Sequence, residues 1–368
     1  MPRIIVPICN RTNYSKLKPV LLGLKNKIDI SIVTSSDMAI SHLANARPDI
    51  LADGLKIDKS IDCLLMNDTL ESMVKTVGIS LIEHASFFAN KNFDAMLLVG
   101  DRFDILPSVL SARMMNIPIL HIQGGERSGS IDDTIRDIIS ICAERHYVAT
   151  ERSKENVLKI AKNKNVFCFG CPSVEIINSF SVGDFLDVSK FKKSYKHSFG
   201  IAPNENYMLV AVHPNTEDQN DIDMDVLLSA VVSFGMKIVV IWPNIDAFNF
   251  KIMEGVRDYE DRIIRVRHMP LEDFVKLIAH TSCMVGNSSA GIREAASFGV
   301  PVVNIGNRQI YRERNANTID CSNSFPDIKN TISQSLKIGS YPKENIYYKE
   351  NCVKNICNDI LEFLCEKT

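Results

Sequence analysis

Residues 284–291 form a stretch in which an expected strand passes through small residues directly into an expected helix. Met284 and Val285 end an apolar run, and the sequence Gly-Asn-Ser-Ser-Ala-Gly follows at 286–291. Glycine lets the main chain approach a ligand closely, and the free N–H groups of a helix start attract an anion. Ser288 and Ser289 add hydroxyl donors. The pattern indicates a phosphate-binding turn, although the same turn also occurs in α/β proteins that bind no phosphate.

Further polar side chains stand where other apolar runs end, which is where open parallel sheets bind their ligands. The second half of the chain contributes mostly donors and cations, which suit an anion: His213, Asn244, His268, Arg308 and Arg312. The first half contributes three carboxylates and one amide together with a cation and a hydroxyl: Arg11, Ser15, Asp101, Gln123, Glu126 and Asp132. His213 is the strongest single candidate, because the following proline disfavours helix and leaves the imidazole at the strand end. Glu294 could accept hydrogen bonds from a ribose diol or simply complement the helix dipole.

Short apolar runs alternate with helical patterns in both halves of the chain. Five runs stand in the first half, at 3–9, 28–35, 93–101, 117–125 and 145–150. Five more stand in the second half, at 208–214, 237–244, 262–270, 282–287 and 300–306. Continuous apolar strands separated by helices predict parallel sheets covered on both faces. We therefore expect an α/β fold of two doubly wound, Rossmann-like domains facing across a cleft. Their expected bounds are 1–172, completed by the helix at 351–368, and 173–350.

Composition excludes several classes of function. The chain has 368 residues with 42 basic against 44 acidic side chains, which gives no reason to expect nucleic acid or an anionic membrane as partner. The first apolar run is too short for a signal peptide and no later run could span a bilayer, so a cytoplasmic protein is expected. The ten cysteines lie mostly in apolar segments, which favours reduced thiols. Cys168 and Cys171 are interpreted as core thiols, since no second pair accompanies them.

Known cofactor motifs do not occur in the sequence. Neither GxxxxGKS nor GxGxxG follows a strand, which disfavours ATP hydrolysis and hydride transfer to a dinucleotide. HExxH and paired CxxC motifs are absent too, so no metal is expected.

Taken together, the strand-end segments resemble the hydrolysing UDP-N-acetylglucosamine 2-epimerases, including those of sialic-acid pathways. The resemblance covers nearly the whole chain. Its markers are CNRTNYSKLKP at 9–19, GDRFD at 100–104, HIQGGERSGSIDDTIRD at 121–137, HPNTED at 213–218, PNID at 243–246, RHMP at 267–270, GNSSAGIREA at 286–295 and GNRQIYRE at 306–313. The resemblance implies the two-domain architecture of one large class of glycosyltransferases, called GT-B, and assembly as a homodimer or homotetramer.

The resemblance also implies a reaction that needs no metal or redox cofactor. A base removes the proton at C2 of a UDP-sugar while UDP leaves C1, and water then adds to the glycal to give the free 2-epimeric sugar. The positions that match UDP-binding residues of the family are Arg11, Ser288, Ser289, Glu294 and Arg308. Those that match residues of catalysis or sugar contact are Asp101, Asp132 and His213. Ser15, Asn244, His268, Gly291 and Arg312 complete the expected substrate-binding set.

Five departures from the family pattern fall in the first half of the chain. They are Asn13 for an acid, Ser35-Ser36-Asp37 for Gly-x-His, Val99 for His, Gln123 for Glu and Asp137 for His. A carboxamide takes up no proton at neutral pH, so if the family's glutamate is the base at C2, Gln123 leaves that role empty and Glu126 is the nearest carboxylate to fill it. Alternatively Asp101 is the base, and Gln123 only binds a group of the sugar. The lost imidazoles suit a less hydroxylated sugar, for which a 2,4-diacetamido-6-deoxy sugar is a candidate beside N-acetylglucosamine. Two other interpretations stay open: a glycosyltransferase with the same fold, and a non-catalytic protein that binds nucleotide sugars.

Overall fold

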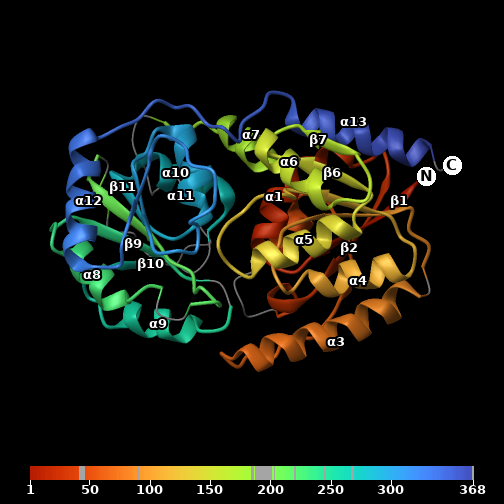
Figure 1. Cartoon of the computed structure of the whole chain (residues 1–368), viewed down its shortest axis with the longest axis horizontal. Coiled ribbons are helices and arrows are strands. Elements are labelled where there is room, and N and C mark those ends of the chain that lie inside the picture. Colours follow the sequence, from red (N-terminus) through yellow and green to blue (C-terminus); the bar gives the residue numbers. More distant parts are fainter. Residues whose placement is uncertain are drawn as a thin grey trace. The chain divides into compact units, whose positions relative to one another are not determined.

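The computed structural model describes residues 1–40, 46–89, 91–183, 186, 201–202, 204–218, 221–243, 246–266 and 269–366. Two compact units are formed (Figure 1), and the chain passes between them more than once. Unit 1 contains residues 1–127, 131–176 and 347–368, and unit 2 contains residues 128–130 and 177–346. None of the described helices is long and apolar enough to cross a bilayer.

Unit 1 is built on a seven-stranded sheet in the order β3-β2-β1-β4-β5-β6-β7, and every described pairing in it is parallel. The strands are β1 (Arg3–Ile8), β2 (Asp29–Thr34), β3 (Ile57–Ser60), β4 (Ala95–Val99), β5 (Ile119–Ile122), β6 (Arg145–Val148) and β7 (Val166–Cys168). The α-helices are α1 (Arg11–Leu24), α2 (Arg47–Ala52), α3 (Leu70–Phe88), α4 (Leu106–Met114), α5 (Asp132–Cys142), α6 (Glu151–Ile160), α7 (Pro172–Asn178), whose last two residues belong to unit 2, and α13 (Cys352–Cys365). The order reverses between β1 and β4, so the crevice beyond their carboxyl ends is where a ligand is expected in unit 1.

Side chains of β1 alternate between two cores. Ile4, Val6 and Ile8 pack in the core that also contains residues of α1 and α13, whereas Ile5 packs in the core with residues of α4 and α5. All four are fully buried. A strand buried on both faces reads as a continuous apolar run, which is why β1 and β4 could be predicted from sequence.

Unit 2 is built on a six-stranded parallel sheet in the order β10-β9-β8-β11-β12-β13. Its strands are β8 (Tyr207–Ala211), β9 (Lys237–Ile241), β10 (Ile264–Val266), β11 (Cys283–Gly286), β12 (Val302–Ile305) and β13 (Thr318–Cys321). Its α-helices are α8 (Met224–Val232), α9 (Asn249–Arg257), α10 (Leu271–His280), α11 (Ser289–Arg293) and α12 (Phe325–Ile338). The reversal falls between β8 and β11, so their carboxyl ends are the expected ligand site of this unit.

The fold class predicted from sequence is confirmed, but three strands were missed. They are the edge strands β3 and β13 of the two sheets and β7 at the far edge of unit 1. β3 reads Ile-Asp-Lys-Ser, and its last two residues are exposed. An edge strand is not enclosed on every side, so its sequence need not carry the long apolar run that marks a central strand.

Three histidines of unit 1 are fully buried, and burial lowers their pKa. Desolvation lowers the pKa of His84 and of His146 to about 4, and that of His121 to about 3. The His121 Nε2–H donates to the Gly100 carbonyl (3.2 Å), and its Nδ1 accepts from the Ser140 hydroxyl (3.3 Å). Neither ring nitrogen of His146 has a hydrogen-bond partner among the described residues. Unit 1 therefore requires these imidazoles to be neutral.

Stability is predicted to fall as the pH drops below about 6.5, the pKa of histidine in an unfolded chain. Between pH 6.5 and the lowered pKa of the folded state, the unfolded chain binds more protons than the folded chain does. A falling pH therefore favours unfolding. His146→Leu should remove the part of this acid destabilisation that comes from His146, about 2 kcal/mol of unfolding free energy at pH 5. Stability at pH 7 should change little, because no hydrogen bond is broken. Urea unfolding of wild type and variant at both pH values measures this difference.

His121→Leu is the matched control, because it removes the bonds to Gly100 and Ser140 and should destabilise unit 1 at pH 7 as well. An equal acid sensitivity of His146→Leu and wild type would contradict the burial argument.

Candidate functional site

The side chain of Asn287 holds the main chain of His213 at the reversal point of the sheet in unit 2. Its Oδ1 accepts the His213 N–H at 2.8 Å, and its Nδ2 donates to the His213 carbonyl at 2.8 Å. Gly286 brings the two strand ends together: its φ is +134°, and a Cβ there would lie 2.2 Å from the Ala211 carbonyl oxygen. Asn287 is 1% exposed. The two hydrogen bonds therefore fix the position of the His213 main chain, and with it the point from which the His213 side chain extends.

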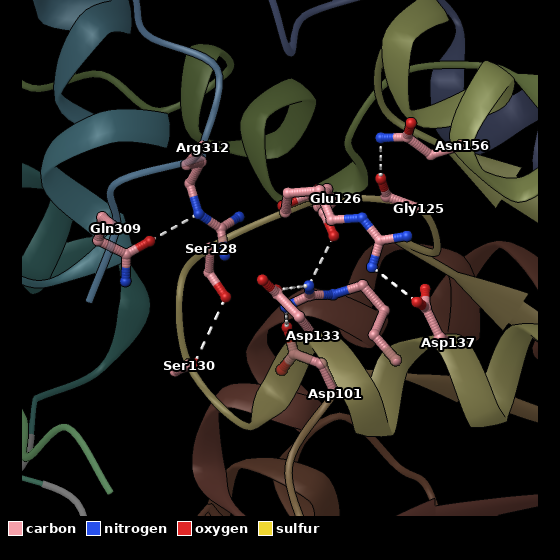
Figure 2. Close-up of polar contacts among 12 residues, drawn as sticks. Asp101, Gly125, Glu126, Ser128, Ser130, Asp133, Asp137, Asn156, Gln309 and Arg312 are labelled. Carbon is pink, nitrogen blue, oxygen red and sulfur yellow. Dashed lines mark hydrogen bonds and ion pairs between the residues drawn. The ribbon is translucent and has the colours of Figure 1, made fainter. Parts of the chain in front are cut away.

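The loop after β12 is attached to the same residue. The Asn287 carbonyl accepts from Arg308 Nη1 (3.1 Å) and from Gln309 Nε2 (3.3 Å), and Gln309 Oε1 accepts from Arg312 Nε (2.7 Å; Figure 2). The Asp221 carboxylate supports the loop, because it accepts from the main-chain N–H groups of Asn307 (2.6 Å) and Arg308 (3.2 Å). Two guanidinium groups are thus positioned at the carboxyl end of the sheet, where a diphosphate could be bound in a forked geometry.

The turn at 286–291 leads into a short helix, α11, of five residues. Ser288 caps α11, and its Oγ accepts the Ala290 N–H at 3.4 Å. The α-helix ends at Arg293, and a 3-10 turn, Ala295–Phe298, continues the chain to Gly299. Ser288, Ser289 and Glu294 are all partly exposed, whereas Gly291 is buried. Five helical residues carry a weak dipole, so hydroxyls and arginines have to supply most of the attraction for an anion.

His213 also lines a small pocket of unit 2 with residues of the following loop and of α9. The lining includes Pro214, Asn215, Asp218, Asp221, Phe248, Lys251 and Asn287. Phe248, the N-cap residue directly before α9, has a φ of +71°, a left-handed conformation that is uncommon for an aromatic residue. Two predicted site residues, Asn244 and His268, lie outside the described residues.

In unit 1 a buried arginine joins the Asp101 carboxylate after β4, the Asp133 carboxylate of α5 and the main-chain carbonyl of Glu126 after β5 (Figure 2). Arg136, on α5, is fully buried; its Nη2 bonds to the Asp101 carboxylate, and its Nη1 bonds to Asp133 Oδ1 (2.5 Å) and the Glu126 carbonyl (2.6 Å). Burial alone would lower the pKa of Arg136, but the charges of Asp101, Asp133 and Glu126 outweigh burial and raise it. The arginine stays charged and ties the loops after β4 and β5 to the start of α5.

The other candidates of unit 1 have separate partners. Gln123 is 5% exposed, has a left-handed φ of +68°, and donates from Nε2 to the Cys171 sulfur at 3.2 Å. Glu126 is buried, while Asp132 is partly exposed in the first turn of α5. Arg11 begins α1, and the Ser15 hydroxyl donates to the Arg11 carbonyl at 3.1 Å. Ser15 thus lies one turn inside the helix rather than at the strand end.

Two of the departures in sequence have a structural role. Asn13 Oδ1 accepts the N–H groups of Cys9 (3.1 Å) and Asn10 (3.2 Å), and its Nδ2 donates to the Val99 carbonyl at 3.0 Å. An aspartate could make the first two bonds but not the third, so the amide joins the ends of β1 and β4. Asp137 accepts from Arg127 Nη1 at 2.7 Å, a bond that histidine in its neutral form would make only weakly.

Three residues that organise the two sites were not predicted: Asn287, Asp221 and Arg136. Asn287 and Arg136 lie inside motifs quoted above, and the spacing of Asp133 and Arg136 at i and i+3 was a visible signal for an ion pair. Asp221 had no such signal, since it is brought to the 306–308 loop only by the fold. Among the described residues, no group of three or more His, Cys, Asp or Glu side chains is arranged to hold a metal ion.

Two parallel-sheet units, with donors and cations beyond the strands of unit 2 and carboxylates beyond those of unit 1, are typical of α/β proteins that bind nucleotides, and comparison with known proteins specifies the class. The chain belongs to the UDP-N-acetylglucosamine 2-epimerase family, whose sequence model matches residues 25–361. It is 31% identical to the UDP-N,N'-diacetylbacillosamine 2-epimerase (hydrolyzing) of Legionella pneumophila, over 94% of this chain and 92% of that protein. It is 26% identical to the UDP-N-acetylglucosamine 2-epimerase of Neisseria meningitidis serogroup B, over 94% and 91% of the two chains.

Solved structures share the fold. The UDP-GlcNAc 2-epimerase from Neisseria meningitidis bound to UDP-GlcNAc has a TM-score of 0.76 at 17% identity, covering 98% of this chain and all of that one (100%). The Methanocaldococcus jannaschii UDP-GlcNAc 2-epimerase in complex with UDP-GlcNAc and UDP has a TM-score of 0.74 at 15% identity, covering 98% and 99%. These likenesses agree with the fold, and the match of the family model to residues 25–361 confirms the family predicted from the strand-end motifs.

Asn287→Ala is predicted to lower kcat for nucleotide-sugar turnover by about 10- to 100-fold, because His213 and Arg308 lose their common support. Asn304→Ala is the matched control: Asn304 is a buried amide of the same sheet, and its Nδ2 donates to Asp320 Oδ1 at 2.6 Å. Steady-state kinetics, at a temperature where circular dichroism shows both variants folded, compares them. Equal kcat values for the two variants would mean that Asn287 has only a structural role.

Proposed function

We propose that the chain is a hydrolysing 2-epimerase that acts on a UDP-linked 2-acetamido sugar. The observation that carries the proposal is the assembly of His213, Ser288 and Arg308 around Asn287, at the carboxyl ends of β8, β11 and β12. Fixed donors and cations at a sheet reversal suit a nucleoside diphosphate, both as a bound group and as a leaving group. The activities for which the relatives are named agree with this chemistry.

The proposed reaction has two stages. A carboxylate takes the proton from C2 while the bond from C1 to the diphosphate oxygen breaks, which forms the C1–C2 double bond and releases UDP. Water then adds its hydroxyl to C1, and a proton returns to C2 from the opposite face. The groups proposed to stabilise the diphosphate as charge develops on it are Arg11, Ser288, Ser289, Arg308 and Arg312, and Glu294 is proposed to accept hydrogen bonds from the ribose hydroxyls. Ser15, Asn244, His268 and Gly291 are the remaining proposed substrate-binding residues.

Glu126 is the proposed C2 base. Gln123 is a carboxamide engaged with Cys171 and takes up no proton. Asp101 holds the buried Arg136 guanidinium, and a carboxylate so bonded is a poor proton acceptor. Glu126 is a carboxylate on the same loop as Gln123, buried in unit 1. Asp101, Asp132 and His213 are proposed to contact the sugar or to move protons in the second stage.

The proposed sugar is a 2,4-diacetamido-6-deoxy sugar, with N-acetylglucosamine as the competing choice. The support comes from the changes at 35–37, 99 and 137, which remove imidazoles from the first half of the chain, and from the name of the Legionella pneumophila relative. We propose that residues 1–172, with 351–368, act on the sugar and that residues 173–350 hold the nucleotide. We also propose a homodimer or homotetramer in the cytoplasm, a compartment that suits the buried thiols of this chain.

Incubation with UDP-N-acetylglucosamine and with the UDP-diacetamido sugar in D2O is predicted to release UDP and a free sugar with deuterium at C2. NMR identifies the product, because the manno configuration and the loss of the C2 proton signal are both visible. Faster release from the diacetamido substrate supports the proposed specificity. Intact UDP-sugar in both tubes, from protein that binds UDP, would contradict an epimerase and favour a binding protein.

The Glu126→Gln variant tests the base in the same assay. It should lose deuterium incorporation and UDP release together while UDP affinity stays within about twofold of wild type, since the nucleotide site is built from other residues. Undiminished exchange in this variant would transfer the role of base to another carboxylate.

A further inference from the structure

In unit 1 the side-chain nitrogen of Lys349 lies against the sulfur of Cys168. Lys349 Nζ donates to Cys168 Sγ at 3.1 Å, to the Cys168 carbonyl at 3.1 Å and to Glu151 Oε1 at 2.8 Å. An ammonium has three hydrogens to donate, and these three acceptors use all of them. The nitrogen is therefore held beside the sulfur, at a place that contains none of the proposed substrate-binding residues.

The main chain brings the two side chains together. Gly170, just after β7, has a φ of +92°, and a Cβ there would lie 2.8 Å from Lys349 Cβ and 2.9 Å from the Lys349 main-chain nitrogen. The Cys171 N–H donates to the Tyr347 carbonyl at 2.9 Å. Glycine thus lets the segment at 347–349 lie directly on the segment that follows β7. The long lysine side chain starts from a fixed point, so its contact with the sulfur is built into the fold.

The sulfur of Cys168 is open to a small oxidant. Cys168 is only half-buried, although the sequence predicted core thiols at both Cys168 and Cys171. The side chains of Lys349 and Glu151 above it are 39% and 68% exposed. Cys171 is fully buried, and its sulfur accepts from Gln123 Nε2 at 3.2 Å. The Lys349 nitrogen is therefore the exposed nucleophile that is held against the Cys168 sulfur.

Both groups keep their protons until an oxidant arrives. Burial raises the pKa of the Cys168 thiol, and the hydrogen bond from Lys349 offsets only part of this rise. Burial lowers the pKa of Lys349, but the bonds to Glu151 and to Cys168 outweigh burial and raise it. A thiol and an ammonium do not react with each other, so the pair stays open under reducing conditions. Oxidation changes this, because a sulfenic acid carries an electrophilic sulfur.

We propose that Cys168 and Lys349 form a redox modification site, at which hydrogen peroxide joins Cys168 Sγ to Lys349 Nζ in a reversible sulfenamide. In the first step Sγ attacks one peroxide oxygen and the O–O bond breaks. The leaving hydroxide takes the thiol proton and departs as water. The sulfur is thereby oxidised to a sulfenic acid, and the peroxide is reduced.

The second step forms the cross-link. Lys349 passes one proton to the Glu151 carboxylate, and its nitrogen then attacks Sγ. The S–N bond forms, the S–O bond breaks, and the leaving hydroxide takes a second proton from the nitrogen to give water. Glu151 returns its proton to solvent. A thiol reductant reverses the step, because its sulfur attacks Sγ and releases the amine, and a second thiol then restores Cys168.

The cross-link would enclose nearly all of unit 2 in a covalent loop. The chain leaves unit 1 after Ile176 and returns to it at Tyr347, so Cys168 precedes the exit and Lys349 follows the return. Closing a long loop lowers the conformational entropy of the unfolded chain. Cross-linked protein should therefore unfold at a higher urea concentration than reduced protein. A sulfenic or sulfinic acid that forms no cross-link would give no such gain.

Peptide mapping of the full chain by mass spectrometry, after treatment with hydrogen peroxide, tests the site. Wild-type protein should yield two peptides joined through Cys168 and Lys349, lighter by two hydrogens than the separate peptides together, and trypsin should no longer cleave after Lys349. Addition of a thiol should restore both peptides. An unmodified Cys168, a Cys168 that carries only added oxygen, or a disulfide from Cys168 to Cys171 would overturn the proposal.

Lys349→Arg separates the cross-link from simple oxidation of the thiol, since arginine keeps the positive charge but its guanidinium stays protonated and does not attack sulfur. This variant should oxidise at Cys168 without any cross-link and without a rise in its urea midpoint. Cys142→Ser is the matched control: Cys142 is a half-buried thiol of α5, and its loss should leave the cross-link and the rise unchanged. A peroxide-dependent rise in Lys349→Arg equal to that of wild type would contradict the proposal.

Discussion

The candidate nucleotide site depends on one buried amide. Asn287 uses both atoms of its carboxamide on the main chain of His213, and its own carbonyl holds Arg308 and Gln309. Three strand ends are joined in this way, with one guanidinium nitrogen of Arg308, Nη1, among the donors. A buried donor and acceptor left unpaired would cost about 1–3 kcal/mol each, so the arrangement of the three loops is strongly preferred over alternatives.

In unit 1 the loops at the strand ends are held in place by a buried charge. Arg136 is placed under the loops after β4 and β5, where Asp101, Asp133 and the Glu126 carbonyl surround its guanidinium. A buried guanidinium without these partners would be costly, so the carboxylates are held as a group and their positions are fixed by it. The two units thus differ in kind: neutral amides orient cations in unit 2, and a cation orients carboxylates in unit 1. Such a division suits a reaction that needs both a held anion and a placed base.

The sequence was sufficient for the parts of the fold that physics constrains most. Central strands such as β1 and β8 are enclosed on both faces, so their composition alone marks them, whereas β3 and β13 at the edges carry polar residues and were missed. The rule that ligands lie beyond strand ends led to His213, Ser288 and Arg308. The same rule could not lead to Asp221, because Asp221 acts on a loop that is remote in sequence: Arg308 follows it by 87 residues. The sequence also could not show that Gln123 has a left-handed backbone and donates to Cys171, because no feature of the neighbouring residues predicts a positive φ at a glutamine.

The central claim, that the loops joined by Asn287 hold a nucleoside diphosphate, is tested most directly by calorimetric titration of the full chain with UDP. Arg308→Ala should weaken UDP binding by about 10- to 100-fold, because a charge-assisted bond to phosphate is lost. Arg265→Ala serves as control, since Arg265 of the same unit pairs with Glu260, and it should bind UDP as wild type does. Wild-type affinity for UDP in Arg308→Ala would contradict the account.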